Sequence, residues 1–375
     1  MQGLEVMLGL EMGKQAPIAW PESRGDILAS LQEAGLPAGT AVHLAEQAQP
    51  ALLLETEVAD EMQIPLGASK IGGLPDLPLD MAWPERPPYE DAVVRARAHR
   101  VEAARLLSEA TRPGSWMTPE QARLFSRERG DLASAVESVF PLAFIAQLDL
   151  ASLSSHAGFP ALLPHHGRLL FFCDYWERPP GFDPHTAAGF RLIWDRTPVE
   201  QLERKPAPAV LAAMMRERWN SLFRPAVVTA RSVFTTIPPS DRNFDAFAHG
   251  EDAGAFWDED SDETRYEGWL ARFGTPDSRE GPNHRLGGWP APLQNGMQAM
   301  AKLATHGIYC GTGDAFNTAE ARHLLKTAHR WRLLLQIGRD DAAGLLPSGC
   351  LYVLMRKQDM RARAFDKAWM VFQSD

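Results

Sequence analysis

The feature that most limits how this chain of 375 residues can fold is a set of three short patterns that occurs twice in the same order. Each set begins with a Gly-Gly pair followed by proline, "KIGGLP" and later "RLGGWP". An apolar stretch interrupted by glutamine comes next, "FIAQLDL" and later "LLLQIGR". A turn into another apolar stretch ends each set, "LPHHGRLLFF" and later "LPSGCLYVLM". This repetition indicates a duplicated structural unit, and chance similarity of short apolar strings is the alternative.

The repetition suggests a division of the chain. Residues 1–50 are predicted to be helical, because "SRGDILASLQEAGLP" spaces its apolar residues as a helix does and ends in helix-stop residues. Residues 51–375 are predicted to form one duplicated domain, with a first repeat at about 51–200 and a second at about 225–375. The stretch 92–138 is rich in Ala, Arg, Leu and Glu, which favour helix, and has no equivalent in the second repeat. We interpret it as a helical insertion.

Short apolar or β-branched runs between turn signals predict strands elsewhere in the chain. Thr118 and Gln121 have capping-box spacing and predict a helix start in the insertion, and Asn317 with Glu320 predicts another near the end. We therefore expect an α+β fold that is mainly β, with a duplicated, roll-like β-sheet core in a pseudo-twofold arrangement, N-terminal helices and a helical insertion.

The residues around the two Gly-Gly pairs form the first group of candidate site residues. Glycine tolerates positive φ and lets another backbone or a ligand approach closely, whereas the following prolines stiffen the chain. Glutamine in a buried strand must be hydrogen-bonded, so Gln147 and Gln336 could each bind the backbone of their own Gly-Gly loop. Alternatively, they could line a cleft between the repeats with Lys70 and His284, which precede the two glycine pairs at roughly equivalent places.

Five sequence blocks, "SKIGGLPDLPLDMAWP", "FIAQLDL", "LPHHGRLLFF", "HRLGGWPAPLQ" and the C-terminal "LPSGCLYVLM", resemble the signature blocks of the YwqG-like family of bacterial proteins. The resemblance runs from about residue 50 to the C-terminus and implies a mainly β, roll-like fold. It implies no activity, because the family has none agreed. The helices at 92–138 are longer than the resemblance predicts, and "LLPSG" stands where the family has "WGD", so any role of that aspartate has no counterpart here.

Charge and cysteine content exclude several classes of protein. A net charge of −10 argues against nucleic acid as a partner, even though the stretch 95–129 is rich in arginine. The three cysteines are scattered, without a C-x-x-C pair, so neither a disulfide framework nor a cysteine-built zinc site is expected. No run reaches the ~18–20 apolar residues that cross a membrane. We expect a cytoplasmic protein without membrane association.

Known catalytic and cofactor motifs are missing from the sequence. "CGTGDAF" lacks the third glycine of a dinucleotide-binding loop, and no Walker A sequence is present. "DEDSDETRYEGW" fails as an EF-hand, because neither its glycine nor its bidentate glutamate is in place. G-x-S-x-G and H-E-x-x-H are also absent. We therefore expect neither a cofactor nor a bound metal.

The sequence favours a non-catalytic binding or protein-interaction module. Its partner could be a protein, met by the basic helices at 95–129 or the acidic loop at 251–267, and a small-molecule ligand is possible. The alternative is a hydrolase-type enzyme, with or without the help of a metal ion, whose site lies in the cleft between the two repeats and uses Asp149, Asp174 or His284. The candidate binding-cleft residues are Lys70, Gly72, Gly73, Gln147, Asp149, Asp174, His284, Gly287, Gly288 and Gln336.

Overall fold

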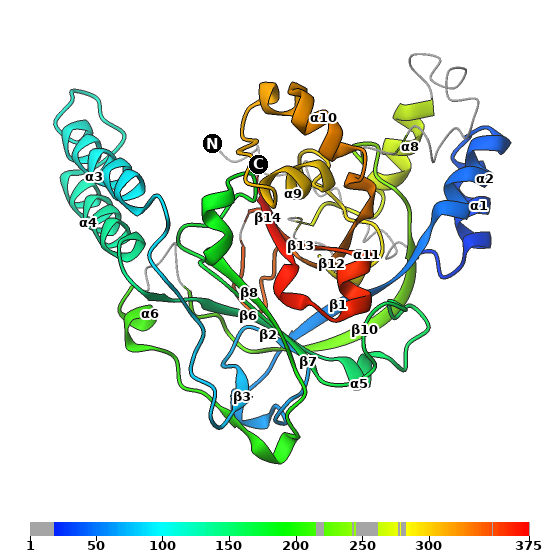
Figure 1. Ribbon diagram of the computed structural model, residues 1–375, viewed down its shortest axis with the longest axis horizontal. Helices are drawn as coiled ribbons and strands as arrows, with labels where there is room; N and C mark the ends of the chain where they lie inside the picture. Colours follow the sequence, from blue (N-terminus) through cyan, green and yellow to red (C-terminus); the bar gives the residue numbers. More distant parts are fainter. Residues whose placement is uncertain are drawn as a thin grey trace, which may run out of the picture.

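A ten-stranded antiparallel sheet forms the centre of the protein (Figure 1). The computed structural model describes residues 19–214, 221–241, 244, 262–276, 278, 283–346 and 348–374. The order of the strands across the sheet is β14-β13-β12-β11-β1-β10-β2-β6-β7-β8. Their bounds are β1 Gln49–Val58, β2 Lys70–Ile71, β6 Ala143–Asp149, β7 Arg168–Cys173, β8 Phe190–Asp195, β10 Ala226–Thr235, β11 His284–Gly287, β12 Trp331–Ile337, β13 Cys350–Arg356 and β14 Trp369–Gln373.

The sheet curls until it is nearly closed, like a barrel. Its two edge strands, β8 and β14, approach each other: the rings of Phe190 and Trp369 lie 6.0 Å apart, edge to face. Trp369 Nε1 also donates to the carbonyl of Gly181, in the connection between β7 and β8, at 2.8 Å. Closure covers the edges that would otherwise be open to pairing with another chain. The largest hydrophobic cluster includes residues from both edge strands.

The sheet contains two sets of five strands that are arranged in the same order from its two edges towards its centre. The first strand set is β1, β2, β6, β7 and β8, and the second strand set is β10, β11, β12, β13 and β14. The outer four strands of each set are neighbours in the same order. The first strand of each set lies beside the second strand of the other set: β1 pairs with β11, and β10 pairs with β2. β1 and β10 pair with each other at the centre of the sheet.

Local sequence signals explain where the main helices begin. Ser23 caps α1, because its hydroxyl accepts from the Asp26 amide at 3.1 Å. The predicted capping box of Thr118 and Gln121 is confirmed at the start of α4. The prediction of an Asn317 cap is wrong by one residue: Thr318 caps α10 instead, accepting from the Ala321 amide at 3.1 Å. The helices are α1 Arg24–Glu33, α2 Ala38–Gln47, α3 Ala92–Glu109, α4 Pro119–Val136, α5 Leu150–Leu153, α6 Ala209–Ala213, α8 Asp262–Ala271, α9 Gln298–Ala304, α10 Ala319–Leu325 and α11 Lys357–Ala362.

The helices lie around the sheet rather than within it (Figure 1). The hairpin of α3 and α4, predicted as an insertion, projects from one side, and the N-terminal helices α1 and α2 lie on the opposite side. Two small two-stranded sheets lie apart from the main one in strand order, β3 Asp76–Pro78 with β9 Leu202–Arg204 and β4 Glu85–Arg86 with β5 Phe140–Pro141. Short 3-10 helices occur at Glu61–Gln63, Pro184–Gly189, Val199–Gln201, Gly313–Asn317, Ala328–Arg330 and Phe365–Lys367.

The expectation of a mainly β fold is corrected by the structure, which is mixed α/β with 37% helix and 23% strand. Most strands are short, and beyond the predicted helices the chain forms the further helices α5, α6, α8, α9 and α11. Of the acidic stretch 251–267, residues 251–261 lie outside the described part, and the rest begins α8. Among the described residues, no helix is both long and apolar enough to cross a membrane.

Candidate functional site

The first Gly-Gly loop, residues 72–76, follows β2 and needs both of its glycines. Gly72 and Gly73 have φ values of +67° and +70°, a region that other residues rarely adopt. A Cβ atom on Gly72 would lie 2.3 Å from the carbonyl oxygen of Arg224, so the backbones pass too closely for any side chain. The Gly72 amide donates to the Ile145 carbonyl at 2.9 Å, which holds the turn against β6.

The second Gly-Gly loop, residues 287–291, follows β11 and has the same conformation. Gly287 and Gly288 have φ values of +74° and +73°. A Cβ atom on Gly287 would lie 2.4 Å from Cγ of Pro160, and one on Gly288 would lie 2.5 Å from Oγ1 of Thr235. Glycine is therefore required at all four predicted positions by both backbone conformation and space.

Gln147 holds the first Gly-Gly loop with both ends of its amide. Its Oε1 accepts from the Asp76 amide at 3.0 Å, and its Nε2 donates to the Ala68 carbonyl at 2.9 Å. The glutamine is fully buried, so these bonds replace the water it lost.

Gln336 does the same for the second loop. Its Oε1 accepts from the Ala291 amide at 2.9 Å, and its Nε2 donates to the Asn283 carbonyl at 3.2 Å. In both loops the amide that binds Oε1 lies four residues after the first glycine, and the carbonyl that binds Nε2 lies four residues before it. The structure thus shows each glutamine tied to its own loop, as the structural interpretation of the sequence expected.

Strand register identifies which residues of the two loops correspond. Lys70 lies opposite Gln147, and Arg285 lies opposite Gln336. The counterpart of Lys70 is therefore Arg285, and the expected correspondence with His284 is off by one residue. Aligning "KIGG" with "RLGG" in the sequence would have found this arginine.

His284 uses both of its ring nitrogens in structural hydrogen bonds. Nδ1 accepts from the Gly338 amide at 3.2 Å, so the ring hydrogen lies on Nε2, which donates to Asp340 Oδ2 at 3.1 Å. Burial acts to raise the pKa of Asp340, but the hydrogen bonds it accepts, chiefly from His284 and also from the Ala343 amide, together hold that pKa below its ordinary value. A histidine with no free nitrogen cannot serve as a general base.

The two candidate aspartates are also engaged. Asp174 is buried, and its Oδ2 accepts from Arg86 Nε at 2.6 Å and from the Tyr89 hydroxyl at 2.9 Å. Its Oδ1 accepts from two backbone amides of the following turn. Asp149 is half-buried and caps α5, accepting from the Ala151 amide at 3.1 Å. Both oxygens of Asp174 thus accept hydrogen bonds within the protein, and Asp149 uses Oδ1 as a helix cap.

A group of three possible metal ligands, Asp91, Asp183 and His185, lies near the base of α3. Arg95 already forms ion pairs with both carboxylates, at 2.7 Å to Asp91 and 2.5 Å to Asp183. Its guanidinium supplies the positive charge that a metal ion would bring. Among the described residues, this group gives no support for the metal-assisted alternative.

The first Gly-Gly loop surrounds a buried cation with acids. The Lys70 ammonium is fully buried and lies 2.9 Å from Glu61 Oε1 and 3.5 Å from Asp76 Oδ2. Arg204 Nε adds a second ion pair to Asp76 at 2.8 Å. Burial lowers the pKa of Lys70, opposed by the nearby carboxylates of Asp76 and Glu61. This site is complete within the protein.

The second Gly-Gly loop surrounds its buried cation without acids. Thr235 stands where the first loop has Glu61: its Oγ1 accepts from the Trp289 amide at 2.7 Å, just as Glu61 Oε2 accepts from the Leu74 amide at 2.9 Å. Ala291 stands where the first loop has Asp76. Both carboxylates that surround the first cation therefore have uncharged residues in their places around the second cation.

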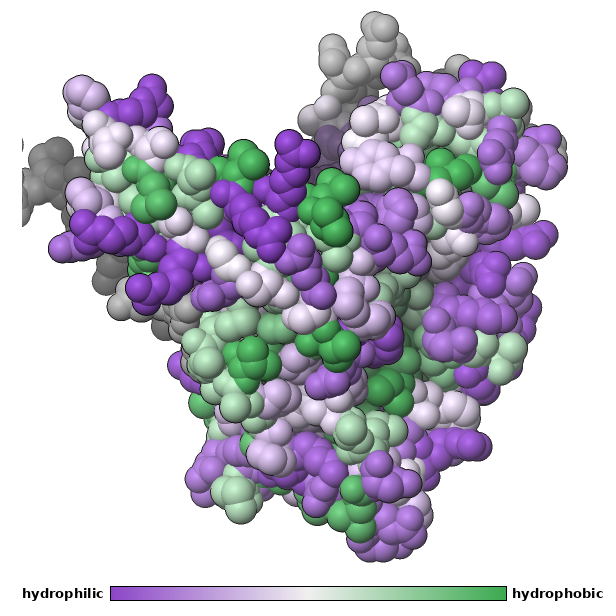
Figure 2. Space-filling model, turned by 60° about the vertical axis from the view of Figure 1, so that its left-hand side comes forward, coloured by the Kyte–Doolittle hydropathy of each residue, from purple (hydrophilic) through white to green (hydrophobic). Residues whose placement is uncertain are grey.

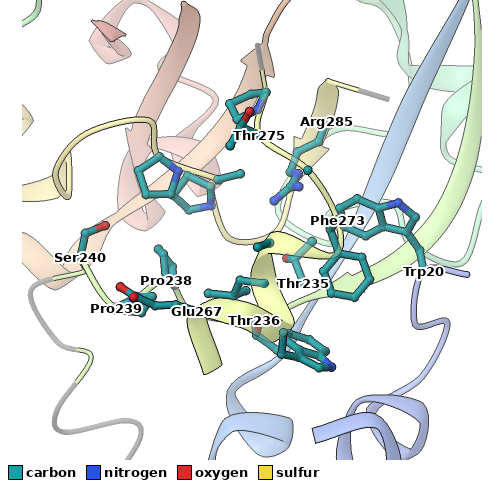
Figure 3. A pocket seen from close by; sticks show the side chains of 18 of the residues that line it. Trp20, Thr235, Thr236, Pro238, Pro239, Ser240, Glu267, Phe273, Thr275 and Arg285 are labelled. Carbon is teal, nitrogen blue, oxygen red and sulfur yellow. The ribbon is translucent and has the colours of Figure 1, made fainter. Parts of the chain in front are cut away.

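Arg285 is consequently a buried cation with no carboxylate partner among the described residues. Only 6% of its surface is exposed. Its Nη1 donates to the Trp289 carbonyl at 2.6 Å, whereas Nε is buried without a partner. Burial lowers the pKa of Arg285 to about 10. The side chain borders a cavity of about 400 Å³ (Figure 3).

The cavity beside the second Gly-Gly loop has mostly apolar walls. Figure 3 shows Arg285, Trp20 and Phe273 at one side of it and Ser240 at the other. Phe273 packs against Trp20 at 4.6 Å between ring centroids, and the Arg285 guanidinium lies 5.4 Å from the Trp20 ring. The residues lining the cavity also include prolines 238, 239, 276, 290 and 292, the rings of Phe234 and Trp269, and exposed Glu267.

The structure does not bring the two sets of candidate residues together. β1 and β10 lie between β2 and β11, which run in opposite directions, so the two Gly-Gly pairs lie at opposite ends of these central strands. The residues that matter at the cavity, Arg285, Thr235 and Trp20, were not among the candidates. Arg285 could have been found by aligning the repeats, but neither Thr235 nor Trp20 gave a sequence signal.

The fold and the paired loops define a mixed α/β protein with a nearly closed antiparallel sheet and a mostly apolar cavity bordered by the buried Arg285. The chain belongs to the family described as Domain of unknown function (DUF1963), which it matches over residues 69–374. No curated protein matches the chain.

Proposed function

We propose that this protein is a non-catalytic binding module for a small molecule, and that its ligand site is the cavity beside the second Gly-Gly loop. The observation that carries the proposal is the difference between two otherwise equivalent loops. The first neutralises its buried lysine with Glu61 and Asp76, whereas the second leaves Arg285 open to a cavity of about 400 Å³. Mostly apolar walls with a few convergent polar groups are typical of ligand sites.

Catalysis has little support from the side chains that the alternative requires. His284, Asp174 and Asp149 are held in structural hydrogen bonds. The cysteines are poor nucleophiles: Cys173 is buried, with a raised pKa, and burial raises the pKa of Cys310 to about 11. A hydrolase-type reaction in a cleft between the two strand sets would have to use other residues.

A protein partner is less well supported than a small molecule. The hairpin of α3 and α4 exposes several apolar side chains, among them Val93, Val94 and Trp116. On the face of the molecule in Figure 2, however, apolar residues occur in small groups separated by charged ones. Single exposed apolar residues are ordinary, and large protein interfaces usually show a continuous patch.

We also propose that the sheet arose by duplication, with the first strand of each copy exchanged between the copies. Matching strand order, equivalent glutamine hydrogen bonds and equivalent register shifts, between Phe144 and Ala146 and between Leu333 and Leu335, support this origin. Membership of the YwqG-like family is proposed on the five sequence blocks. Neither proposal assigns an activity.

A cavity-filling variant tests the proposed site. Ala291 lines the cavity, and its backbone is held by Gln336 and by the Tyr352 hydroxyl. Ala291→Phe should therefore fill the cavity and keep the loop in place. Ala98→Phe, on an exposed face of α3, is the matched control.

A panel of neutral, anionic and cationic aryl compounds would be screened by ligand-detected NMR against the three proteins. We expect compounds that bind the unmodified protein and Ala98→Phe but not Ala291→Phe. Binding that Ala291→Phe leaves unchanged would place the site elsewhere, and a folded protein that binds no compound of the panel would contradict the proposal.

A further inference from the structure

We infer that the ligand of this cavity is a small monocarboxylate with a flat apolar body, whose carboxylate binds the Nε and Nη2 edge of Arg285. The inference rests on the proposed function and gives the chemistry of its ligand. Its basis is the comparison of the two loops. The protein supplies two carboxylates, Glu61 and Asp76, to Lys70 in the first loop and, among the described residues, none to Arg285 at the equivalent position of the second.

The need for an anion follows from the cost of a buried, unpaired charge. A guanidinium away from water is stabilised by a carboxylate and penalised without one. Lys70, at the equivalent position, has Glu61 at 2.9 Å and Asp76 at 3.5 Å. Arg285 has neither acid, and among the residues that the structure describes no other carboxylate pairs with it. A ligand that brings one carboxylate completes the second site as the protein completes the first.

The free donors of Arg285 favour a carboxylate over other anions. Nη1 is used by the Trp289 carbonyl, so Nε and Nη2 are the donors without a partner in the described structure. These two N–H groups lie side by side in one plane and match the two oxygens of a carboxylate. Glu267 is the other charged residue that lines the cavity, and its negative charge disfavours a ligand with a second negative group.

The walls indicate the shape of the rest of the ligand. Trp20, Phe273 and the prolines offer flat apolar surfaces on which a ring can stack. Ser240 Oγ, across the cavity from Arg285 in Figure 3, is buried and has no partner among the described residues. A hydroxyl or other small polar group at the far end of the ligand would satisfy it.

The probe 4-hydroxyphenylacetate has these features, and its methyl ester has the same shape without the charge. Affinity would be measured by titration, followed by tryptophan fluorescence, because Trp20 and Trp269 line the cavity. With the unmodified protein, the acid should bind at least about tenfold more tightly than the ester, as expected for paired charged hydrogen bonds. Arg285→Gln should remove this preference.

The two loops supply a second test that leaves the arginine in place. Thr235→Glu puts a carboxylate where the first loop has Glu61, so it should pair with Arg285 and remove the preference for the acid. Thr235→Gln has nearly the same size and can still accept from the Trp289 amide, but it brings no charge. It should keep the preference, which separates charge from bulk.

The possible results distinguish the carboxylate inference from the proposed binding site. Equal binding of acid and ester by the unmodified protein would overturn the carboxylate inference and leave the proposed site standing. Equal effects of Thr235→Glu and Thr235→Gln would also overturn it. Binding of neither probe by folded protein would overturn the inference, and only the wider panel with Ala291→Phe then decides the proposed function. If Arg285→Gln does not fold, the Thr235 pair carries the test.

Discussion

Gln147 and Gln336 are polar residues in otherwise apolar strands, and each uses both ends of its amide on one loop. Gln147 also donates to the Asp76 carboxylate at 3.0 Å, a bond that Gln336 has no counterpart for. Leucine at either position would keep the size of the side chain but leave a buried backbone amide and carbonyl without partners. The two positions therefore differ in a way that can be measured.

We predict that Gln147→Leu lowers the free energy of unfolding by about 3–4 kcal/mol and Gln336→Leu by about 2–3 kcal/mol. Urea denaturation monitored by circular dichroism measures both. Gln32→Leu, at an exposed position of α1, should change it by less than about 0.5 kcal/mol. Losses at the two buried positions no greater than that of Gln32→Leu would show that the loops are not held by the amides.

At this scale the sequence predicted some residues and missed others, for physical reasons. A buried polar residue in a strand destabilises the fold unless it is hydrogen-bonded, and a Gly-Gly pair does so unless the turn requires it. The glutamines and glycines could therefore be recognised. A lysine or arginine beside a loop is ordinary on a protein surface. That Lys70 is paired and Arg285 is not depends on Glu61, Asp76 and Thr235, whose positions in space the sequence does not show.

The first Gly-Gly loop is held by an ionic cluster that depends on pH. Burial acts to raise the pKa of Asp76, but the hydrogen bond from Arg204 and the charge of Lys70 hold it below its ordinary value. A carboxylate with a lowered pKa in the folded state stabilises the fold above the pKa of the unfolded chain. That stabilisation is lost as the pH falls through about 3.8 towards the folded value.

We predict that Asp76→Asn lowers the unfolding free energy by about 3 kcal/mol at pH 7, and that this loss is up to about 1 kcal/mol smaller at pH 3, where the carboxyl of the unfolded chain is mostly protonated. Denaturant titrations between pH 7 and pH 3 test this. Asp80→Asn, four residues away and exposed, should have little effect at any pH in this range. A loss from Asp76→Asn that is the same at both ends of the range would contradict the role of its charge.

The hairpin of α3 and α4 is joined to the body mainly at its base. Arg86 pairs with buried Asp174 at 2.6 Å, and the Tyr89 hydroxyl bonds the same carboxylate. Towards the tip, Leu106, Met117 and Ala122 form a small cluster of their own. The base and the tip should therefore differ in their importance to the fold.

Replacing residues 104–126 by a short Gly-Ser linker should lower the Tm by less than about 5 °C. Asp174→Asn, which leaves the buried Arg86 without its partner, should cost about 3–5 kcal/mol. Calorimetry of both proteins makes the comparison. A larger loss from the shortened hairpin than from Asp174→Asn would mean that the tip holds the body together.

Across the whole molecule, the two strand sets depend on each other. β1 belongs to the first strand set but lies between β10 and β11 of the second, and β10 lies between β1 and β2 of the first. Neither set can complete its part of the sheet alone. The sequence could predict most strands, because their apolar runs are local, and could suggest two copies. It could not predict that β1 and β10 each lie among the strands of the other set, or that the sheet nearly closes, because the apolar pattern of a strand does not specify which strand it pairs with.

We predict that fragments 1–205 and 206–375 do not fold separately and that mixing them restores the fold. Size-exclusion chromatography and circular dichroism of each fragment and of the refolded mixture measure this. A fragment that is monomeric and unfolds cooperatively on its own would show that the strand exchange is not needed.

The difference between the two loops is the central claim, and a crystal structure with 4-hydroxyphenylacetate tests it most directly. We predict electron density for the probe in the cavity, with its carboxylate within hydrogen-bond distance of Nε and Nη2 of Arg285 and its ring against Trp20 and Phe273. Density for the probe away from Arg285, or a cavity without the probe at saturating concentration, would contradict the account.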